Sequence, residues 1–375
     1  MTCAVIRQPE GLQQKTCVMK SLDVAPARLS NQLLGEKKCN TPNEVVAWLG
    51  AMQAQDFAAA KWALGLRMHK ATDNDIEKAF NDGAILRTHI MRPTWHFVVP
   101  QDLRSLLALT APRVHAANAH MYRKLELDDD LLSRCHTVIT KALRGKNFLT
   151  RTELANHLAE NRIEAAGPRL AYMIMHAELE VLICSGPRRG KQFTYALLEE
   201  RAPQTKKFRR DEALAQWALR YFASHGPAQL KDFAWWSGLT LQDAQKGLDL
   251  AVPQLAHEII DGKTYWFSPN TKTVKSKAPA ALLLSIYDEY TIAYKDRSAL
   301  GGEQYSAKLL AMGNALTSVL ILDGKIAGTW KRVIKKGRVE ITMYPFRPLR
   351  KDEHEAIKAA AAGYGEFLEM PWVLS

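Results

Sequence analysis

Apolar residues recur first at helical and then at strand spacing between Thr41 and Pro100. TPNEVVAWLGAM opens with a capping box of Thr41 and Glu44 and then places apolar residues on one helical face. AAAKWALGLR and TDNDIEKAFNDG predict two more helices, the second ending at a glycine. AILRTHIMRPTWHFVVP alternates on both sides of an Arg-Pro bend, so it predicts a two-stranded hairpin.

The same order of helices and hairpin recurs in two later segments. LTRTELANHLAE and GPRLAYMIMHAELE predict helices, and VLICSGPRRGKQFTYALLEE predicts two strands around a basic tip. HGPAQLKDFAWWSGLTLQDAQKGLDLA predicts helix, turn and helix, and AHEIIDGKTYWFSP predicts a hairpin with an Asp-Gly turn. Helices followed by a hairpin are typical of the winged helix-turn-helix, which binds nucleic acid or, as the alternative, protein partners.

The last hundred residues have a different pattern. SVLILDGKIAGTWKRVIKKGRVEITMYPF predicts consecutive strands joined at Asp323-Gly324 and Lys336-Gly337, and KDEHEAIKAAAAGYGEFLE predicts a terminal helix. We therefore expect an α+β protein with three tandem winged helix-turn-helix domains followed by a β-rich C-terminal lobe. The expected ranges are a flexible N-terminal extension at 1–20, winged helices at 21–125, 126–205 and 206–275, and the lobe at 276–375.

Net charge narrows the class of partner. The 375 residues contain 51 Lys and Arg against 39 Asp and Glu, a formal charge of +12. This balance indicates a polyanion, nucleic acid before an anionic membrane surface, and a basic protein with a solvated surface is the alternative. No apolar run approaches the roughly 20 residues that cross a bilayer, and no signal peptide is evident. We expect a monomer in the bacterial cytoplasm, associated with the nucleoid.

The cysteines and histidines do not predict a bound metal. The five cysteines are scattered without CxxC spacing, and the histidines show no HExxH or similar ligand spacing. A disulfide framework is not expected, and a reducing cytoplasm fits this usage. The expectation is therefore no metal and no cofactor.

AMQAQDF, residues 51–57, places two glutamines one residue apart. On a helix, Gln53 and Gln55 would point to different sides. Asp56 is suited to cap the next helix, which would leave Gln53-Ala54-Gln55 as a non-helical joint. In an extended joint, residues two apart point to the same side, so both amides can face one cavity. Surface polarity or local capping is the alternative.

The other motifs along the chain help to interpret Gln53-Ala54-Gln55. MQAQD, then RTHIMRPTWHFV in the first wing, then YDEYTIAYKDR and LDGKIAGTWKR occur in this order within a three-wing pattern. In this combination the chain resembles the tandem winged-helix DNA glycosylase superfamily of the AlkZ and YcaQ (AlkX) type, over about Leu22 to Tyr344. The superfamily's signature is glutamine, an apolar residue, then glutamine or aspartate, and Gln53-Ala54-Gln55 matches the glutamine branch.

The resemblance implies a concave DNA-binding scaffold, Gln53 and Gln55 as catalytic residues, and a hairpin of the β-rich lobe that probes the duplex. A purine alkylated at N7 leaves as a neutral base, so the site needs mainly to hold a water and stabilise an oxocarbenium-like transition state. Amides, which both donate and accept hydrogen bonds, can orient that water. Asp56 is expected to cap the next helix and, in addition, to have an auxiliary role in catalysis.

The implied function is a monofunctional DNA glycosylase that hydrolyses the N-glycosidic bond of N7- or N3-alkylated purines in double-stranded DNA. Unhooking of interstrand crosslinks, known in the superfamily, is left open by the sequence. The alternative is a non-catalytic winged-helix DNA-binding protein such as a transcriptional regulator.

Polar and basic residues at the predicted bends and tips are the expected DNA contacts. They are Arg92, Thr94, His96, Arg188, Arg189, Lys191, Lys331, Arg332, Lys335 and Lys336. His89 and His96 either contact DNA or pack on the wing, and the basic run in the lobe can also be a solvated face. Asp288, Asp296 and Arg297 resemble superfamily positions, as ion pairs that fix the lobe or as direct contacts. The remaining expectation is core packing for Trp95, Trp235 and Trp236.

Overall fold

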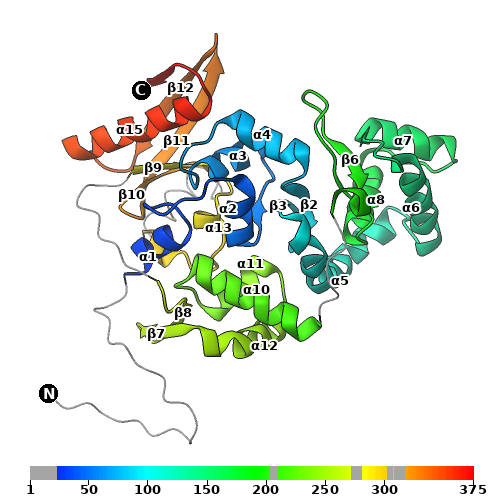
Figure 1. Ribbon diagram of the computed structural model, residues 1–375, viewed down its shortest axis with the longest axis horizontal. Coiled ribbons are helices and arrows are strands. Elements are labelled where there is room, and N and C mark those ends of the chain that lie inside the picture. The colour runs from blue at the N-terminus through cyan, green and yellow to red at the C-terminus, as the bar shows by residue number, and fades with distance from the viewer. Residues whose placement is uncertain (1–22, 203–208, 272–280, 302–306, 308–316) are drawn as a thin grey trace, which may run out of the picture.

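The computed structural model describes residues 23–202, 209–271, 281–301, 307 and 317–375, so the expected extension at 1–20 lies outside the described part. The mixed α+β architecture predicted from the sequence is confirmed. Figure 1 shows a central unit in blue and cyan, flanked by a green unit, a yellow-green unit and an orange-red lobe. Within the described ranges, no helix is both long and apolar enough for a membrane crossing.

The central unit has the order helix, short strand, two helices and hairpin. Helix α1 (Val24–Asn31) precedes it, and its elements are α2 (Pro42–Leu49), β1 (Met52–Gln53), α3 (Phe57–Gly65), α4 (Asp73–Asp82), β2 (Leu86–Ile90) and β3 (Thr94–Val98). The predicted capping boxes form, since Thr41 accepts from the Glu44 amide and Thr72 from the Asp75 amide. The predicted hairpin is also confirmed, but it belongs to a sheet of order β1-β3-β2 whose edge strand β1 the sequence did not predict.

Helix α5 (Pro100–Lys124) leads into a second unit with the same order of elements. They are α6 (Asp129–Leu143), β4 (Leu149–Thr150), α7 (Arg151–Glu160), α8 (Gly167–Leu179), β5 (Ile183–Ser185), β6 (Thr194–Leu197) and the short helix α9 (Leu198–Arg201). The sheet order β4-β6-β5 matches that of the central unit. Thr150 and Glu153 form the predicted capping box of α7.

The third unit repeats the order again. Its elements are α10 (Arg210–His225), α11 (Leu230–Ser237), α12 (Leu241–Ala251), the 3-10 helix η1 (Val252–Gln254), β7 (Ala256–Ile260) and β8 (Lys263–Phe267). An isolated bridge between Ala228 and Trp266 occupies the place of the short strand in the other units. The predicted Asp261-Gly262 turn joins β7 to β8.

The C-terminal lobe is a five-stranded sheet covered by a helix. Its elements are β9 (Ala281–Leu284), α13 (Glu289–Ile292), η2 (Ser298–Leu300), β10 (Val319–Leu322), β11 (Lys325–Lys335), β12 (Arg338–Pro345), α15 (Lys351–Phe367) and β13 (Trp372–Leu374). The sheet order is β13-β12-β11-β10-β9. The turns predicted at Asp323-Gly324 and Lys336-Gly337, and the terminal helix, are confirmed.

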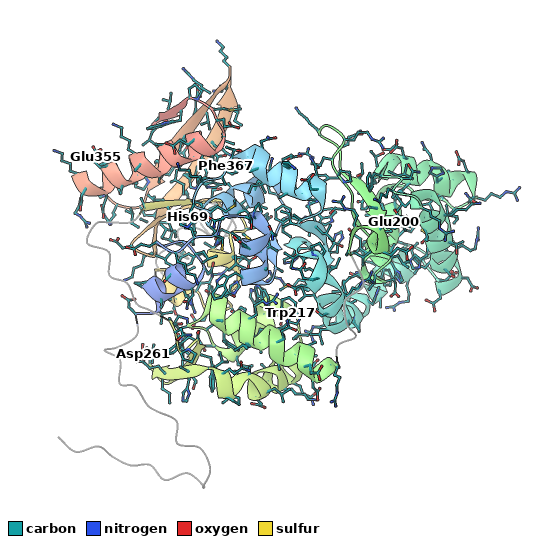
Figure 2. The ribbon with its side chains drawn as sticks, in the orientation of Figure 1. His69, Glu200, Trp217, Asp261, Glu355 and Phe367 are labelled. Atoms are coloured by element: carbon teal, nitrogen blue, oxygen red, sulfur yellow. The ribbon has the colours of Figure 1, made fainter. Side chains whose placement is uncertain are left out.

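Two hydrophobic cores meet at β1. Ala51 belongs to a core shared with α5 and the third unit, whereas Met52 belongs to the core between the central unit and the lobe. Gly50 turns the chain into β1 at a φ of 87°, and a Cβ there would lie 2.8 Å from a ring carbon of Trp217. Figure 2 shows Trp217 where α10 meets the central unit, and Phe367 where α15 meets it. The β1 segment is therefore held from both sides.

Candidate active site

The two glutamines lie on an extended segment, as the joint hypothesis predicted. Gln53 pairs with His96 across β1 and β3, and the Ala54 amide donates to the Trp95 carbonyl at 2.7 Å. Both side chains are tied to residues 92–95, which form the bend and the start of β3. Gln53 Oε1 accepts from Arg92 Nη2 at 3.2 Å, and Gln55 Oε1 accepts from the Trp95 amide at 3.4 Å. Gln53 is half-buried and Gln55 is exposed, so a reactant can reach the pair from solvent.

Asp56 ends the extended segment and starts the next helix. Its Oδ1 accepts from the Ala59 amide at 2.9 Å, which makes it the N-cap of α3. The predicted capping role is confirmed. Gln55 therefore immediately precedes the N-cap of α3.

A buried carboxylate that the sequence reasoning missed lies directly behind Gln53. Glu289 is 1% exposed, and its Oε1 accepts from the Gln53 amide at 2.8 Å. Its Oε2 accepts from Trp236 Nε1 at 3.1 Å. Burial raises the pKa of Glu289, but the nearby His225 ring and the Gln53 amide outweigh burial, so the pKa lies below its usual value. The motif YDEYTIAYKDR contains Glu289, and that motif was the available signal.

His96 lies beside Gln53 inside the sheet. The side chain is 1% exposed, and Nδ1 contacts the Thr94 carbonyl at 2.9 Å. Burial, followed by the positive charge of Arg92, lowers the pKa of His96 to about 4, so the ring is neutral at pH 7. This burial corrects the expectation of a DNA contact at His96, since a phosphate cannot reach the ring. The alternative, packing on the wing, is what the structure has.

A pH effect on stability follows from His96. Its pKa is near 6.5 in the unfolded chain and about 4 in the folded protein, so only the unfolded chain binds the proton between these values. The contribution of neutral His96 to the free energy of unfolding is complete above pH 6.5 and is lost as the pH falls toward 4. Between pH 7.5 and pH 5, urea unfolding should show wild type losing about 2 kcal/mol more than His96→Gln. Equal losses in the two proteins would contradict the assignment.

The rest of the bend closes the site against the third unit. The Arg92 guanidinium lies 5.5 Å from the centre of the Trp235 ring, and burial lowers the pKa of Arg92. Trp236 is 1% exposed, as expected, but Trp235 is 42% exposed, which corrects the expectation that it is core. Trp235 stays at the rim because its Nε1 donates to the Ile292 carbonyl at 3.1 Å. Thr94 is half-buried, and its hydroxyl finds no hydrogen-bond partner among the described residues.

A buried ion pair supports the site from the lobe. Arg67 donates to both carboxylate oxygens of Asp288, at 2.8 and 2.9 Å, and neither side chain is exposed. Asp296 likewise pairs with Lys263 at 2.7 Å. Of the two alternatives for Asp288 and Asp296, internal pairing is therefore observed. Arg297 is half-buried, and burial lowers its pKa.

The basic tip between β5 and β6 contacts the central unit. Arg188 contacts both carboxylate oxygens of Glu77, at 3.1 and 3.2 Å, and its side chain is 16% exposed. Arg189 pairs with Glu153 at 2.6 Å and keeps 54% of its side chain exposed. Lys191 is exposed. The Arg188 guanidinium thus joins two units, which leaves Arg189 and Lys191 as the more accessible cations.

The hairpin of β11 and β12 carries the third group of predicted contacts. In Figure 1 it extends away from the body of the lobe. Lys331, Lys335 and Lys336 are exposed, and Arg332 is half-buried, 5.5 Å from the centre of the Tyr364 ring. Two apolar residues near the tip, Val333 and Ile334, are 49% and 50% exposed. The hairpin therefore presents apolar and cationic side chains together.

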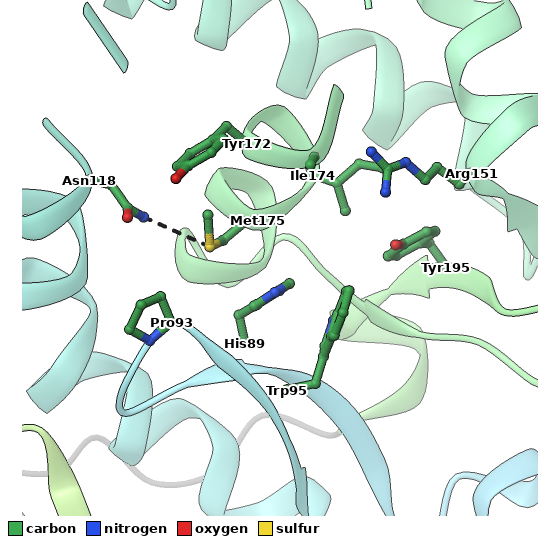
Figure 3. Close-up of a pocket in the computed structure, with 10 residues that line it drawn as sticks. His89, Pro93, Trp95, Asn118, Arg151, Tyr172, Ile174, Met175 and Tyr195 are labelled. Carbon is green, nitrogen blue, oxygen red and sulfur yellow. Dashed lines mark hydrogen bonds between the residues drawn. The ribbon is translucent and has the colours of Figure 1, made fainter. Parts of the chain in front are cut away.

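A cavity of about 210 Å³ lies between the first wing and the second unit. Figure 3 shows His89 and Trp95 reaching from the wing toward Tyr172 and Met175 of α8. The ring centres of His89 and Trp95 are 4.4 Å apart, and His89 Nδ1 contacts a Glu178 carboxylate oxygen. Neither glutamine is among the residues that line this cavity.

Comparisons with known proteins agree with this fold, and they define the class as DNA glycosylase. A family model described as DNA glycosylase AlkZ-like matches residues 46–367. The chain belongs to this AlkZ-like family, so it is an enzyme, and the resemblance seen in the sequence is confirmed. An "Interstrand DNA cross-link repair glycosylase" of Streptomyces sahachiroi is 25% identical over 355 residues, covering 89% of this chain and 94% of that protein.

The fold has a solved counterpart. The structure of Streptomyces sahachiroi DNA glycosylase AlkZ superposes with a TM-score of 0.77 at 18% identity, covering 94% of this chain and 98% of the other. This similarity extends through the units and the lobe. It is therefore a similarity of the whole fold rather than of one domain.

Proposed function

We propose that this enzyme is a monofunctional glycosylase that releases N7- or N3-alkylated purines from double-stranded DNA by hydrolysis. Gln53 and Gln55 hold the attacking water at C1′ of the sugar. The observation that carries the proposal is that the two amides lie on one extended segment, fixed between two cores and bonded to residues 92–95 at the bend and the start of β3. The family does not favour the alternative of a non-catalytic regulator.

The chemistry fits two neutral amides. An alkylated purine already carries positive charge and leaves neutral, so its departure needs little proton donation. The site must orient water and accommodate the oxocarbenium-like sugar, both of which depend on fixed geometry. Glu289 positions Gln53 by accepting from its main-chain amide at the edge of the sheet, which also brings a negative charge close to the segment. The motif contains no lysine for a Schiff base, so the product is an abasic site.

The three repeating units are the proposed winged helices of the DNA-binding scaffold. The matching sheet orders of the first two, and the bridge at the same place in the third, support this reading. The hairpin of β11 and β12 is the proposed probe of the duplex. Its exposed Val333 and Ile334 fit an apolar wedge at a base step, and its lysines fit the flanking phosphates. The name of the Streptomyces relative supports crosslinked DNA as a further substrate.

If the hairpin of β11 and β12 binds DNA, its lysines should affect how the DNA affinity depends on salt concentration. Replacing Lys335 and Lys336 by alanine removes two exposed cations, so the slope of log K against log salt should become shallower by about 1.8. Fluorescence anisotropy with one labelled duplex at four salt concentrations measures this slope. The control variant with Lys351→Ala and Lys358→Ala, on α15, should keep the wild-type slope. An unchanged slope in the hairpin variant would remove the hairpin from the interface.

The substrate class is tested with a panel of duplexes. Each carries N7-methylguanine, N3-methyladenine, an interstrand crosslink or no lesion, and abasic sites are counted after alkaline cleavage. We expect abasic sites from both methylated duplexes and none from undamaged DNA. Binding of all duplexes without base release from any of them would support the regulator instead.

A further inference from the structure

The side chains of three histidines and one glutamate lie close together in the second unit. The histidines are far apart in the sequence, so no local motif reveals the cluster. His115 lies on α5, His136 on α6 and His176 on α8, and Glu180 follows the last residue of α8. His176 and Glu180 are four residues apart, so they share a face of that helix. In Figure 1 these three helices pack together at the right of the molecule.

The ligand atoms are already close to one another. His176 Nδ1 lies 3.1 Å from His136 Nε2, and His115 Nε2 lies 3.0 Å from Glu180 Oε1. Ligand atoms of His115, His176 and Glu180 all lie within 4.8 Å of one another. In a tetrahedral zinc site these separations are about 3.3 Å, because each bond is about 2.0–2.1 Å long. Two edges of the tetrahedron are thus nearly formed, and His136 joins the group of three through its contact with His176.

One ring nitrogen in the cluster has no hydrogen-bond partner among the described residues. His115 Nε2 is buried and has no hydrogen bond among the described residues, despite its short contact with Glu180. The other nitrogen, Nδ1, lies 2.9 Å from Tyr122 Oη. When Nδ1–H donates to the tyrosine oxygen, the Nε2 lone pair points into the cluster. Metal-bound histidines are held in this way by a partner on the far nitrogen.

The cluster is open to solvent on one side. A surface hollow of about 250 Å³ is lined by both His115 and Glu180, which gives an ion a route from solvent.

We infer that His115, His136, His176 and Glu180 form a structural site for one zinc-like divalent transition metal. Three nitrogens and one carboxylate oxygen fit the ligand preference of Zn²⁺. The metal would join α5, which comes from the central unit, to α6 and α8 of the second unit. The expectation of no metal site depended on local spacing, whereas these ligands come from three separate helices.

The test uses the full chain, purified without a histidine tag and treated with a chelator. Added Co²⁺ should bind at one ion per chain and give the visible absorption of a tetrahedral site, and Zn²⁺ should displace it. Zn²⁺ should also raise the melting temperature of this protein. In His176→Ala, the affinity should fall on the order of 100-fold and the thermal shift should disappear.

Two further variants make the result decisive. His157→Ala removes another histidine of the same unit, 41% exposed on α7, and should bind Co²⁺ as wild type does. Glu180→Gln changes an exposed side chain, so it keeps the fold even if His176→Ala does not, and its affinity should fall at least ~10-fold. The inference is overturned if wild type binds no stoichiometric Co²⁺, or if Glu180→Gln binds as tightly as wild type.

Discussion

Replacing both Gln53 and Gln55 by alanine should lower the rate of base release from N7-methylguanine DNA by at least ~100-fold, because water is no longer positioned at C1′. The main chain of β1 does not depend on the two side-chain amides, since its pairing with β3 and its hydrogen bond to Glu289 both use main-chain atoms of β1. Affinity for the same duplex should therefore stay within about threefold of wild type, given that phosphate contacts dominate it. Single-turnover assays and anisotropy measure the two quantities.

Matched variants separate positioning from general damage. Gln101→Ala removes an exposed amide at the start of α5 and should leave the rate unchanged. Glu289→Gln keeps an acceptor for the Gln53 amide but removes the charge, so its rate should fall between wild type and the double variant. Wild-type activity in the double glutamine variant would remove both residues from the mechanism.

The second large effect concerns stability. Replacing Asp288 by alanine leaves the fully buried Arg67 guanidinium without its counter-ion, which should lower the free energy of unfolding by about 3–5 kcal/mol. The same carboxylate caps α13 by accepting from the Tyr290 amide at 2.9 Å, so the loss also loosens the segment that holds Glu289. Urea unfolding followed by circular dichroism measures the change.

An exposed ion pair provides the control for Asp288. Asp82 pairs with Lys78 on α4, and its side chain is 58% exposed. Asp82→Ala should cost less than about 1 kcal/mol, since solvent screens the pair and replaces it. A cost for Asp288→Ala as small as that of Asp82→Ala would show that the buried pair does not hold the lobe.

Local chemistry explains what the sequence could predict. Capping boxes and Asp-Gly turns are decided within four or five residues, so Thr41, Thr72 and Thr150 marked helix starts correctly. The non-helical joint at Gln53-Ala54-Gln55 was also predictable, because a capped helix ends before it and the Asp56 cap follows it.

The missed features all depend on residues far apart in sequence. Strand β1 exists because it pairs with β3, more than forty residues later. Glu289 reaches the Gln53 amide across 236 positions, and Arg188 meets Glu77 across 111. His96 alternates like a strand residue on a wing, yet it is 1% exposed in the folded protein. These contacts are set by how the units dock, which a local pattern does not record.

Two amides are proposed to suffice for hydrolysis because the alkylated base leaves as a neutral molecule. Comparing a cationic with an uncharged base tests this proposal directly. Single-turnover release from N7-methylguanine, which is cationic, is measured beside release from O6-methylguanine, which is uncharged, in the same duplex sequence. We expect release of the cationic base to be at least ~1,000-fold faster, since no group in the motif donates a proton to a leaving base. Comparable release of the two bases would contradict it.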